Sequence, residues 1–139
     1  MSLYLCVFDF SEKYEKEVFG VEVGSYAYFG FFRDCICKYV EKNRRGSVCP
    51  NIMNHEDANG FYTPEECTSV IKELSLVRRA FEEIPVDDNI LLNSNIVQNS
   101  NLQNNLSDYF VDIDGCNLIT QLELICECAV NNNLNVYFQ

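Results

Sequence analysis

Hydrophobic and polar positions along the chain fall into short stretches that predict both strands and helices. Residues 3–8 are apolar on both faces and rich in strand formers, which predicts an interior strand covered from two sides or lying beside a helix layer. Residues 18–23 alternate weakly and end at Gly24, so they predict a second short strand or an extended lead-in. Residues 135–138 predict a closing strand. Because this strand follows a helix, it is expected to pair in parallel with its predecessor.

Three further stretches repeat apolar residues at three- and four-residue steps, as one buried helix face requires. Ser25 is a good N-cap, and the stripe after it predicts a helix over residues 26–42. Residues 63–66, Thr-Pro-Glu-Glu, combine an N-cap, a proline at the first helical position and two acids that suit the helix dipole, so a second helix begins here and ends before Pro85. Residues 118–129 carry the stripe of a third helix.

The second predicted helix shows a clear division between an inner and an outer face. Its inner stripe runs from Cys67 to Phe81 at helical spacing. Charged residues, Glu73 and Arg78 among them, fall between the apolar positions and are expected to face water.

Polar segments separate the predicted elements. Residues 43–60 predict a long structured loop in which only residues 48–53 have an extended pattern, and the asparagine-rich residues 86–107 predict another long loop. Residues 108–113 look like a strand, which ends at the turn signal Asp114-Gly115.

Length and composition fit one domain that spans residues 1–139. Its 139 residues, 47% of them apolar, are enough for one core. The elements indicate an α+β fold, with a small mixed β-sheet packed against about three α-helices. The first residues lack the pattern of a signal peptide, and no apolar run reaches the roughly 20 residues that a membrane span needs. We therefore expect a soluble protein of the cytoplasm with no membrane partner.

Charge and cysteine usage narrow the possible partners and cofactors. The net charge of −11 disfavours direct nucleic-acid binding and speeds encounter with a basic protein surface. The eight cysteines sit among apolar residues and are expected to be reduced core thiols. The pairs Cys35/Cys37 and Cys126/Cys128 lie two apart in predicted helices, where side chains diverge by about 200°, and this disfavours zinc.

The usual sequence signatures of catalysis are missing. The chain has no G-x-S-x-G motif, no G-x-G-x-x-G motif and no phosphate loop, so we expect no enzyme activity and no catalytic residues. A cysteine nucleophile paired with His55, the chain's one histidine, stays open as an alternative.

Residues 55–66 copy most of a calcium-binding loop. Asp57, Asn59, Gly60 and Glu66 stand at positions three, five, six and twelve of the pattern D-x-[DN]-x-[DN]-G-x5-E. These residues predict a possible metal site with Asp57, Asn59 and Glu66 as ligands, and calcium is the one cofactor that the sequence suggests.

Two features of the same segment argue against calcium. His55 replaces the acid expected at position one, and the residues just before it do not read as a helix. In the structural alternative, Asp57 and Asn59 tie a tight turn, Gly60 takes a positive φ and Thr63 caps the next helix.

Several motifs, taken in order, resemble one known family. They are Gly24, Ser25, Tyr26, Phe29, Phe32, Arg33 and Asp34, then His55, Asp57 and Gly60, then Asp112, Asp114 and Gly115, and finally the terminal Tyr137, Phe138 and Gln139. This set resembles the immunity protein 70 family of bacterial polymorphic toxin systems, whose members are encoded beside a secreted toxin that they neutralise. The resemblance touches both ends and the middle of the chain, with residues 86–107 as its idiosyncratic part.

The resemblance implies a stoichiometric inhibitor in the bacterial cytoplasm that binds a cognate toxin domain and has no catalytic residues. An acidic surface suits a basic toxin such as a nuclease. Asn59 and Phe61 depart from the family pattern, in which acidic or polar residues are expected, and this weakens the calcium hypothesis more than the family resemblance. Arg33 and Asp34, polar residues on an aromatic helix, are expected to form a structural ion pair, with partner contact as the lesser role.

Overall fold

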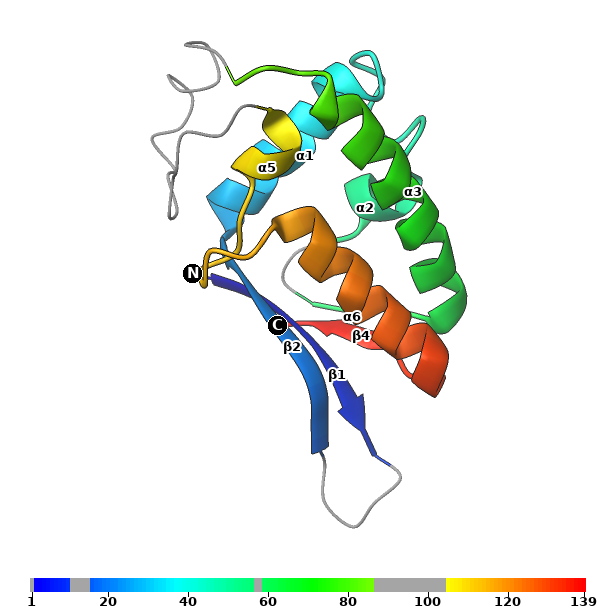
Figure 1. Cartoon of the computed structure of the whole chain (residues 1–139). Helices are drawn as coiled ribbons and strands as arrows, with labels where there is room; N and C mark the ends of the chain where they lie inside the picture. Colours follow the sequence, from blue (N-terminus) through cyan, green and yellow to red (C-terminus); the bar gives the residue numbers. More distant parts are fainter. Residues whose placement is uncertain (1, 11–15, 57–58, 87–104) are drawn as a thin grey trace.

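The computed structural model describes residues 2–10, 16–56, 59–86 and 105–139, which form a four-stranded sheet with helices packed against it (Figure 1). The strands are β1 (Ser2–Asp9), β2 (Lys16–Ser25), β3 (Phe61–Tyr62) and β4 (Val136–Phe138), in the sheet order β2-β1-β4-β3. The helices are α1 (Tyr26–Tyr39), α2 (Pro50–Asn54), α3 (Pro64–Glu82), α5 (Leu106–Tyr109) and α6 (Leu118–Asn132). The predicted α+β class is confirmed.

Strand β1 lies inside the sheet, as its apolar sequence predicts. Leu5 pairs with Val21 of β2 on one side and with Phe138 of β4 on the other. Leu3, Leu5 and Val7 point into the core, and the alternate residues point to the opposite face. The second predicted strand is confirmed as β2 and is longer than the pattern indicates.

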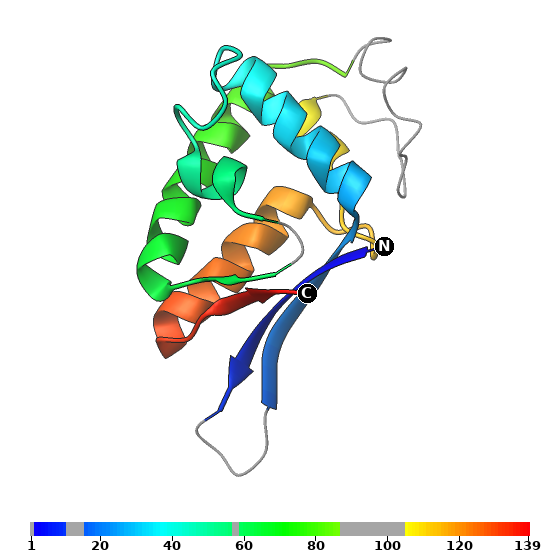
Figure 2. The ribbon, with the colours of Figure 1, turned by 180° about the vertical axis from the view of Figure 1, so that it is seen from behind.

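Strand β4 is antiparallel to both of its neighbours, so the parallel pairing expected for the last strand is wrong. The segment expected to precede it in the sheet, residues 108–113, is not a strand. Helix α6 returns the chain along the sheet, and β4 then enters between β1 and β3 (Figure 2). The sheet of the described strands is therefore antiparallel rather than mixed.

The caps of α1 and α3 follow the sequence signals. The Ser25 hydroxyl accepts a hydrogen bond from the Tyr28 N–H at 3.0 Å and begins α1. Helix α1 ends at Tyr39, before the predicted residue 42, because Lys42 and Asn43 take positive φ angles. Thr63 forms a capping box with the third helical residue and begins α3 at the predicted proline.

Two short helices stand where the sequence pattern indicates extended chain. Residues 50–53 of the predicted extended piece lie in α2, and residues 108–109 of the predicted strand lie in α5. The Asn105 carboxamide accepts a hydrogen bond from the Asp108 N–H at 3.0 Å and starts α5. What is left of the predicted strand is one antiparallel bridge between Val111 and Asn117.

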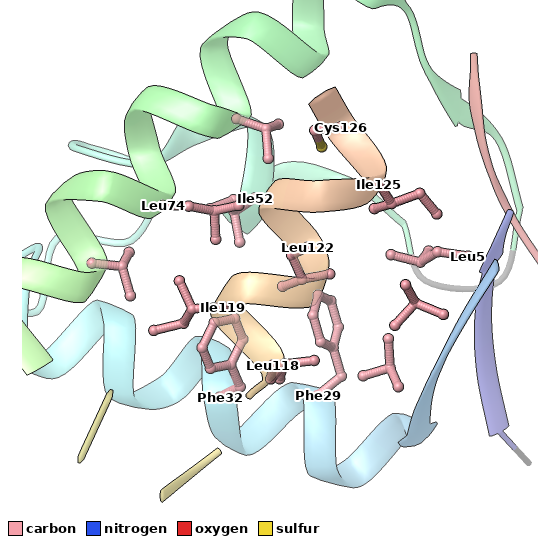
Figure 3. Packing of buried hydrophobic residues seen from close by; sticks show 14 of the residues in the cluster. Leu5, Phe29, Phe32, Ile52, Leu74, Leu118, Ile119, Leu122, Ile125 and Cys126 are labelled. Atoms are coloured by element: carbon pink, nitrogen blue, oxygen red, sulfur yellow. The ribbon is translucent and has the colours of Figure 1, made fainter. Parts of the chain in front are cut away.

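The core lies between the helices and one face of the sheet (Figure 3). Phe29 and Phe32 of α1 meet the inner face of α6, from which Ile119, Leu122 and Ile125 point inward. Helices α3 and α6 pack lengthwise, and Arg78 ties them by donating to Thr120 and Glu123. Within the described residues, no helix is long and apolar enough to cross a membrane.

Candidate protein-binding surface

The face of the sheet that points away from the core carries a row of aromatic side chains. Tyr4 and Phe8 of β1 alternate with the core residues and so lie on this outer face. Tyr137 pairs with Cys6, and Phe61 pairs with Tyr137, which extends the same face across β4 and β3. The described helices lie on the other side of the sheet (Figures 1 and 2).

Phe10, just beyond the end of β1, joins three of these side chains in a chain of contacting rings. We call Phe8, Phe10, Phe61 and Tyr137 the aromatic cluster. The ring centroids are 6.0 Å apart for Phe8 and Phe10, 6.0 Å for Phe10 and Tyr137, and 5.7 Å for Phe61 and Tyr137. Phe10 is 53% exposed and Phe61 is 45% exposed. Single exposed apolar side chains are normal on a protein surface, whereas a contacting group of large, partly exposed rings makes this face a candidate interaction surface.

The residues next to the cluster on β1 and β2 are closely packed. Cys6 lies among these residues and is fully buried, although its side chain points away from the main core. The Tyr4 ring lies across Gly20, where an added Cβ would stand 2.0 Å from the Tyr4 hydroxyl oxygen. Gly20 therefore lets this ring lie flat against β2, and any larger residue there would displace it.

Acidic side chains border the aromatic cluster on the β2 side. Glu17 is paired with Phe8, Glu22 is paired with Tyr4, and both are exposed. The Tyr4 hydroxyl donates a hydrogen bond to the Glu17 carboxylate. This bond, helped by partial burial and by the negative charges nearby, raises the pKa of Tyr4 to about 12. The tyrosine therefore stays a donor that fixes Glu17 beside the rings.

His55 has a structural position on the opposite side of β4 from the cluster. Its ring stacks on Phe138 with centroids 3.9 Å apart and meets Tyr62 edge-on at 4.7 Å. Its ring nitrogens lie 2.7 Å from the Glu56 carbonyl oxygen and 3.3 Å from the Phe61 carbonyl oxygen. The imidazole thus holds the chain that leads into β3.

Most of the buried cysteines have the environment of inert core thiols. Cys67 is the exception, because a hydrogen bond with Cys126 lowers its pKa. Burial raises the pKa of Cys35 and of Cys49 to about 12 and that of Cys6 to about 11. A nucleophilic cysteine needs a lowered pKa, so these three thiols do not suit the alternative in which His55 activates a cysteine. All eight cysteines are free.

Arg33 and Asp34 point in different directions from α1. Arg33 is buried, lies over the Phe29 ring and donates hydrogen bonds to the carbonyl oxygens of Ile52 and His55 at 2.9 and 2.7 Å. Asp34 is exposed, and its described ion pair is with Arg45 at 4.0 Å. The expected pair between residues 33 and 34 is therefore wrong, because neighbours on a helix point about 100° apart.

The structure describes two of the three predicted calcium ligands. Asp57 lies outside the described residues, Asn59 is exposed, and Glu66 accepts a hydrogen bond from the Thr63 N–H at 3.1 Å as part of the capping box. Gly60 takes the expected positive φ of +89°. In the described ranges no three acidic, histidine or cysteine side chains group as a metal site would require. Calcium binding remains a prediction.

The last motif of the predicted set is a turn. The Asp112 carboxylate accepts hydrogen bonds from the Asp114 and Cys116 N–H groups at 2.9 and 3.0 Å, and Gly115 has a φ of +83°. Most of the described motif residues therefore have structural roles: Ser25 caps a helix, Phe29 and Phe32 fill the core, and Asp112 and Gly115 shape a turn. The aromatic cluster was missed by sequence reasoning. Its one signal in the sequence is that Tyr4, Cys6 and Phe8 occupy alternate positions on β1. The same pattern fits a strand that is buried on both faces.

The protein is thus a small acidic α+β protein with a group of exposed aromatic side chains on the face of the sheet that the described helices leave open. The family model of immunity protein 70 matches residues 3–138, and the chain belongs to this family of immunity proteins. No significant match was found among curated proteins or among solved structures.

Proposed function

We propose that this protein neutralises a cognate bacterial toxin by binding it directly and stoichiometrically in the cytoplasm of the producing cell. The observation that carries this proposal is the family match, which extends over residues 3–138. Immunity through binding needs a surface and no reaction, and the one histidine, His55, packs on Phe138 and holds the chain that enters β3.

The charge of the chain indicates the kind of toxin that would fit. With 21 acidic and 10 basic residues, the protein attracts a basic surface and repels the phosphates of nucleic acids. A basic toxin domain of a polymorphic toxin system would be steered toward it, and such steering raises association rates more than it raises affinity.

A pull-down combined with a rescue assay tests the proposal. The bait is the C-terminal domain of the toxin encoded beside this gene, and the matched control is a toxin domain from an unrelated locus. We expect tight one-to-one binding to the first domain alone, together with survival of cells that express it. A folded cognate domain that is neither bound nor neutralised would overturn the proposal.

Calcium-responsive binding is the second candidate, and one observation favours it. Helix α2 ends directly before residue 55 and α3 begins at position ten of the loop, so the segment 55–66 joins two helices as a calcium loop does. Glu66→Gln keeps an oxygen for the capping box but removes the charged ligand. Calcium-induced heat and a rise in Tm in the wild type, both absent in Glu66→Gln, would support this candidate, and no response in either protein would remove it.

A further inference from the structure

We propose that the aromatic cluster is the surface that holds the toxin, and that the toxin presents a basic segment there, with an arginine or lysine side chain over the rings and its cation beside Glu17. This inference rests on the proposed function and adds to it a contact surface and the chemistry of the partner.

The exposed rings supply the apolar part of the interaction. Phe10 and Phe61 are about half exposed and lie on either side of Tyr137, so a partner that covers Tyr137 also removes both phenylalanines from water. Large aromatic side chains at the centre of an interface contribute most of the binding free energy in many complexes. The cluster has this composition at a face that the described helices leave uncovered (Figure 1).

The cluster is also rigid, which lowers the cost of binding. Three of its rings, Phe8, Phe61 and Tyr137, come from paired strands, and the strand that carries Phe8 is anchored in the core by Leu5 and Val7. Because these rings are already held in place, little conformational entropy remains to be lost when a partner arrives.

The acids on this face select a cationic occupant. Glu17 is paired with Phe8 of the cluster, and Glu22 is paired with Tyr4 on the same face. The Tyr4 hydroxyl holds the Glu17 carboxylate in position. A guanidinium or ammonium group that lies over an aromatic face gains a cation–π attraction. The Glu17 carboxylate on the same face can form an ion pair with that group. The two attractions favour the same type of side chain.

The same acids disfavour the two other occupants that an aromatic face attracts. A second copy of this chain docked on the cluster would bring its own Glu17 and Glu22 into the same interface, so the interface would gain two more negative charges and no cation from these positions. Nucleic-acid bases would stack on the rings, but their phosphates would be repelled by the rim and by the net charge of −11.

The first part of the test compares two pairs of truncations. The double variant Phe10→Ala with Phe61→Ala, here called the aromatic pair, removes the exposed rings. The control double variant Leu76→Ala with Leu124→Ala, the helix pair, removes two side chains of similar exposure, 46% and 42%, on α3 and α6. With the cognate toxin domain as probe, we expect the aromatic pair to raise Kd by at least about 30-fold and the helix pair to change it by less than about twofold. Circular dichroism and Tm establish that each variant is folded.

The second part tests the charge of the occupant. Glu17→Lys and Glu22→Lys are each expected to slow association by about tenfold at low salt, with a smaller effect at high salt. Glu17→Lys also removes the hydrogen bond from the Tyr4 hydroxyl, whereas Glu22→Lys leaves that bond in place, so an effect shared by both variants comes from charge. If the aromatic pair weakens binding but neither lysine variant does, the basic character of the occupant is wrong.

The outcomes separate this inference from the proposed function. If the wild type does not bind the toxin domain, the proposed function fails. If the wild type binds and the helix pair weakens binding while the aromatic pair does not, the function stands and the surface is wrong. If the free wild type is a dimer that Phe10→Ala with Phe61→Ala dissociates, the cluster is filled by a second copy and the inference is overturned.

Discussion

At the scale of single residues, three buried charged side chains fix the segment between α1 and β3: Arg33 from α1, Glu73 from α3, and Glu41 from the segment itself. Arg33 binds carbonyl oxygens of this segment, and Glu41 and Glu73 bind its N–H groups. Glu73 accepts from the Asn51 and Ile52 N–H groups and so caps α2 from another helix. Each of these charges is buried with backbone partners, which makes it costly to remove.

Glu41 gives a pH-dependent prediction. Burial by itself would raise its pKa, but hydrogen bonds from the Cys49, Val48 and Gly46 N–H groups, with Arg45 nearby, lower it below the ordinary 4.5. A lowered folded pKa means that the stabilisation is complete above pH 4.5 and is lost as the pH falls through the folded value. We expect Glu41→Gln to lower the free energy of unfolding by about 2 kcal/mol at pH 7, and the difference to shrink below pH 4.5.

Urea unfolding at a series of pH values measures this difference. Glu82→Gln, an exposed substitution at the end of α3, is the control and should leave stability nearly unchanged. A gap between wild type and Glu41→Gln that widens toward acid would contradict the prediction.

Arg33 gives a prediction about geometry at constant charge. Its guanidinium reaches two carbonyl oxygens while lying over Phe29, which a lysine ammonium cannot reproduce. We expect Arg33→Lys to lower the free energy of unfolding by about 2 kcal/mol. The same denaturation assay on Arg44→Lys, at an exposed arginine, should show little change, and equal losses in the two variants would be evidence against the role of Arg33.

Sequence reasoning predicts residues at this scale when their role is local. Ser25, Thr63 and Gly115 act within a few residues of their own positions, and their predicted roles are confirmed. Glu73 was assigned to the outer face of its helix because charged residues usually face water, and this is wrong. Its partners are 21 and 22 residues away in the chain, a distance that no local pattern reports.

At the scale of elements, the capping box of α3 is the most testable feature. The Thr63 hydroxyl accepts from the Glu66 N–H at 3.2 Å, and no other side chain of the described residues makes that bond. We expect Thr63→Ala to lower Tm through a loss of about 1 kcal/mol, whereas Thr68→Ala, exposed within the same helix, should be neutral or slightly stabilising. Thermal unfolding followed by circular dichroism measures both, and equal Tm values for the two variants would argue against the cap.

The elements that sequence reasoning missed are those that depend on other parts of the chain. Residues 108–113 have strand formers, but the Val111 N–H bonds the Tyr28 hydroxyl at 2.9 Å and Phe110 fills the core between α1 and α3. Their apolar character serves burial rather than pairing. Strand β3 has only two residues and exists because β4 runs beside it, so its own sequence carries no signal of sufficient length.

At the scale of the whole molecule, the net charge of −11 sets how the protein meets its partner. If the toxin domain is basic, long-range attraction speeds the encounter and salt screens it. We expect the association rate constant to fall about tenfold or more between roughly 20 mM and roughly 500 mM NaCl, while dissociation changes less. Stopped-flow or surface-binding kinetics measures both rates, and a salt-independent association rate would contradict electrostatic steering.

The arrangement of the sheet also belongs to this scale, and sequence reasoning predicted it least well. The strands of the first hairpin were found, and so was the closing strand, but the position and direction of the closing strand were not. The order β2-β1-β4-β3 follows from packing α6 over the sheet and returning the chain to the edge of β1. Such long-range pairing is decided by the assembled core and not by the pattern within any one strand.

The position of β4 between β1 and β3 has a consequence for folding during translation. Residues 136–138 are made after every other described element, yet they join β1 to β3 and supply Tyr137 to the aromatic cluster. A nascent chain that has left the ribosome only as far as α6 holds β1 with an open edge and β3 without the neighbour it pairs with. The sheet, and with it the proposed toxin-binding surface, is completed only when β4 is added. Protection would therefore begin once residues 136–138 have left the ribosome, rather than grow as the earlier elements are synthesised.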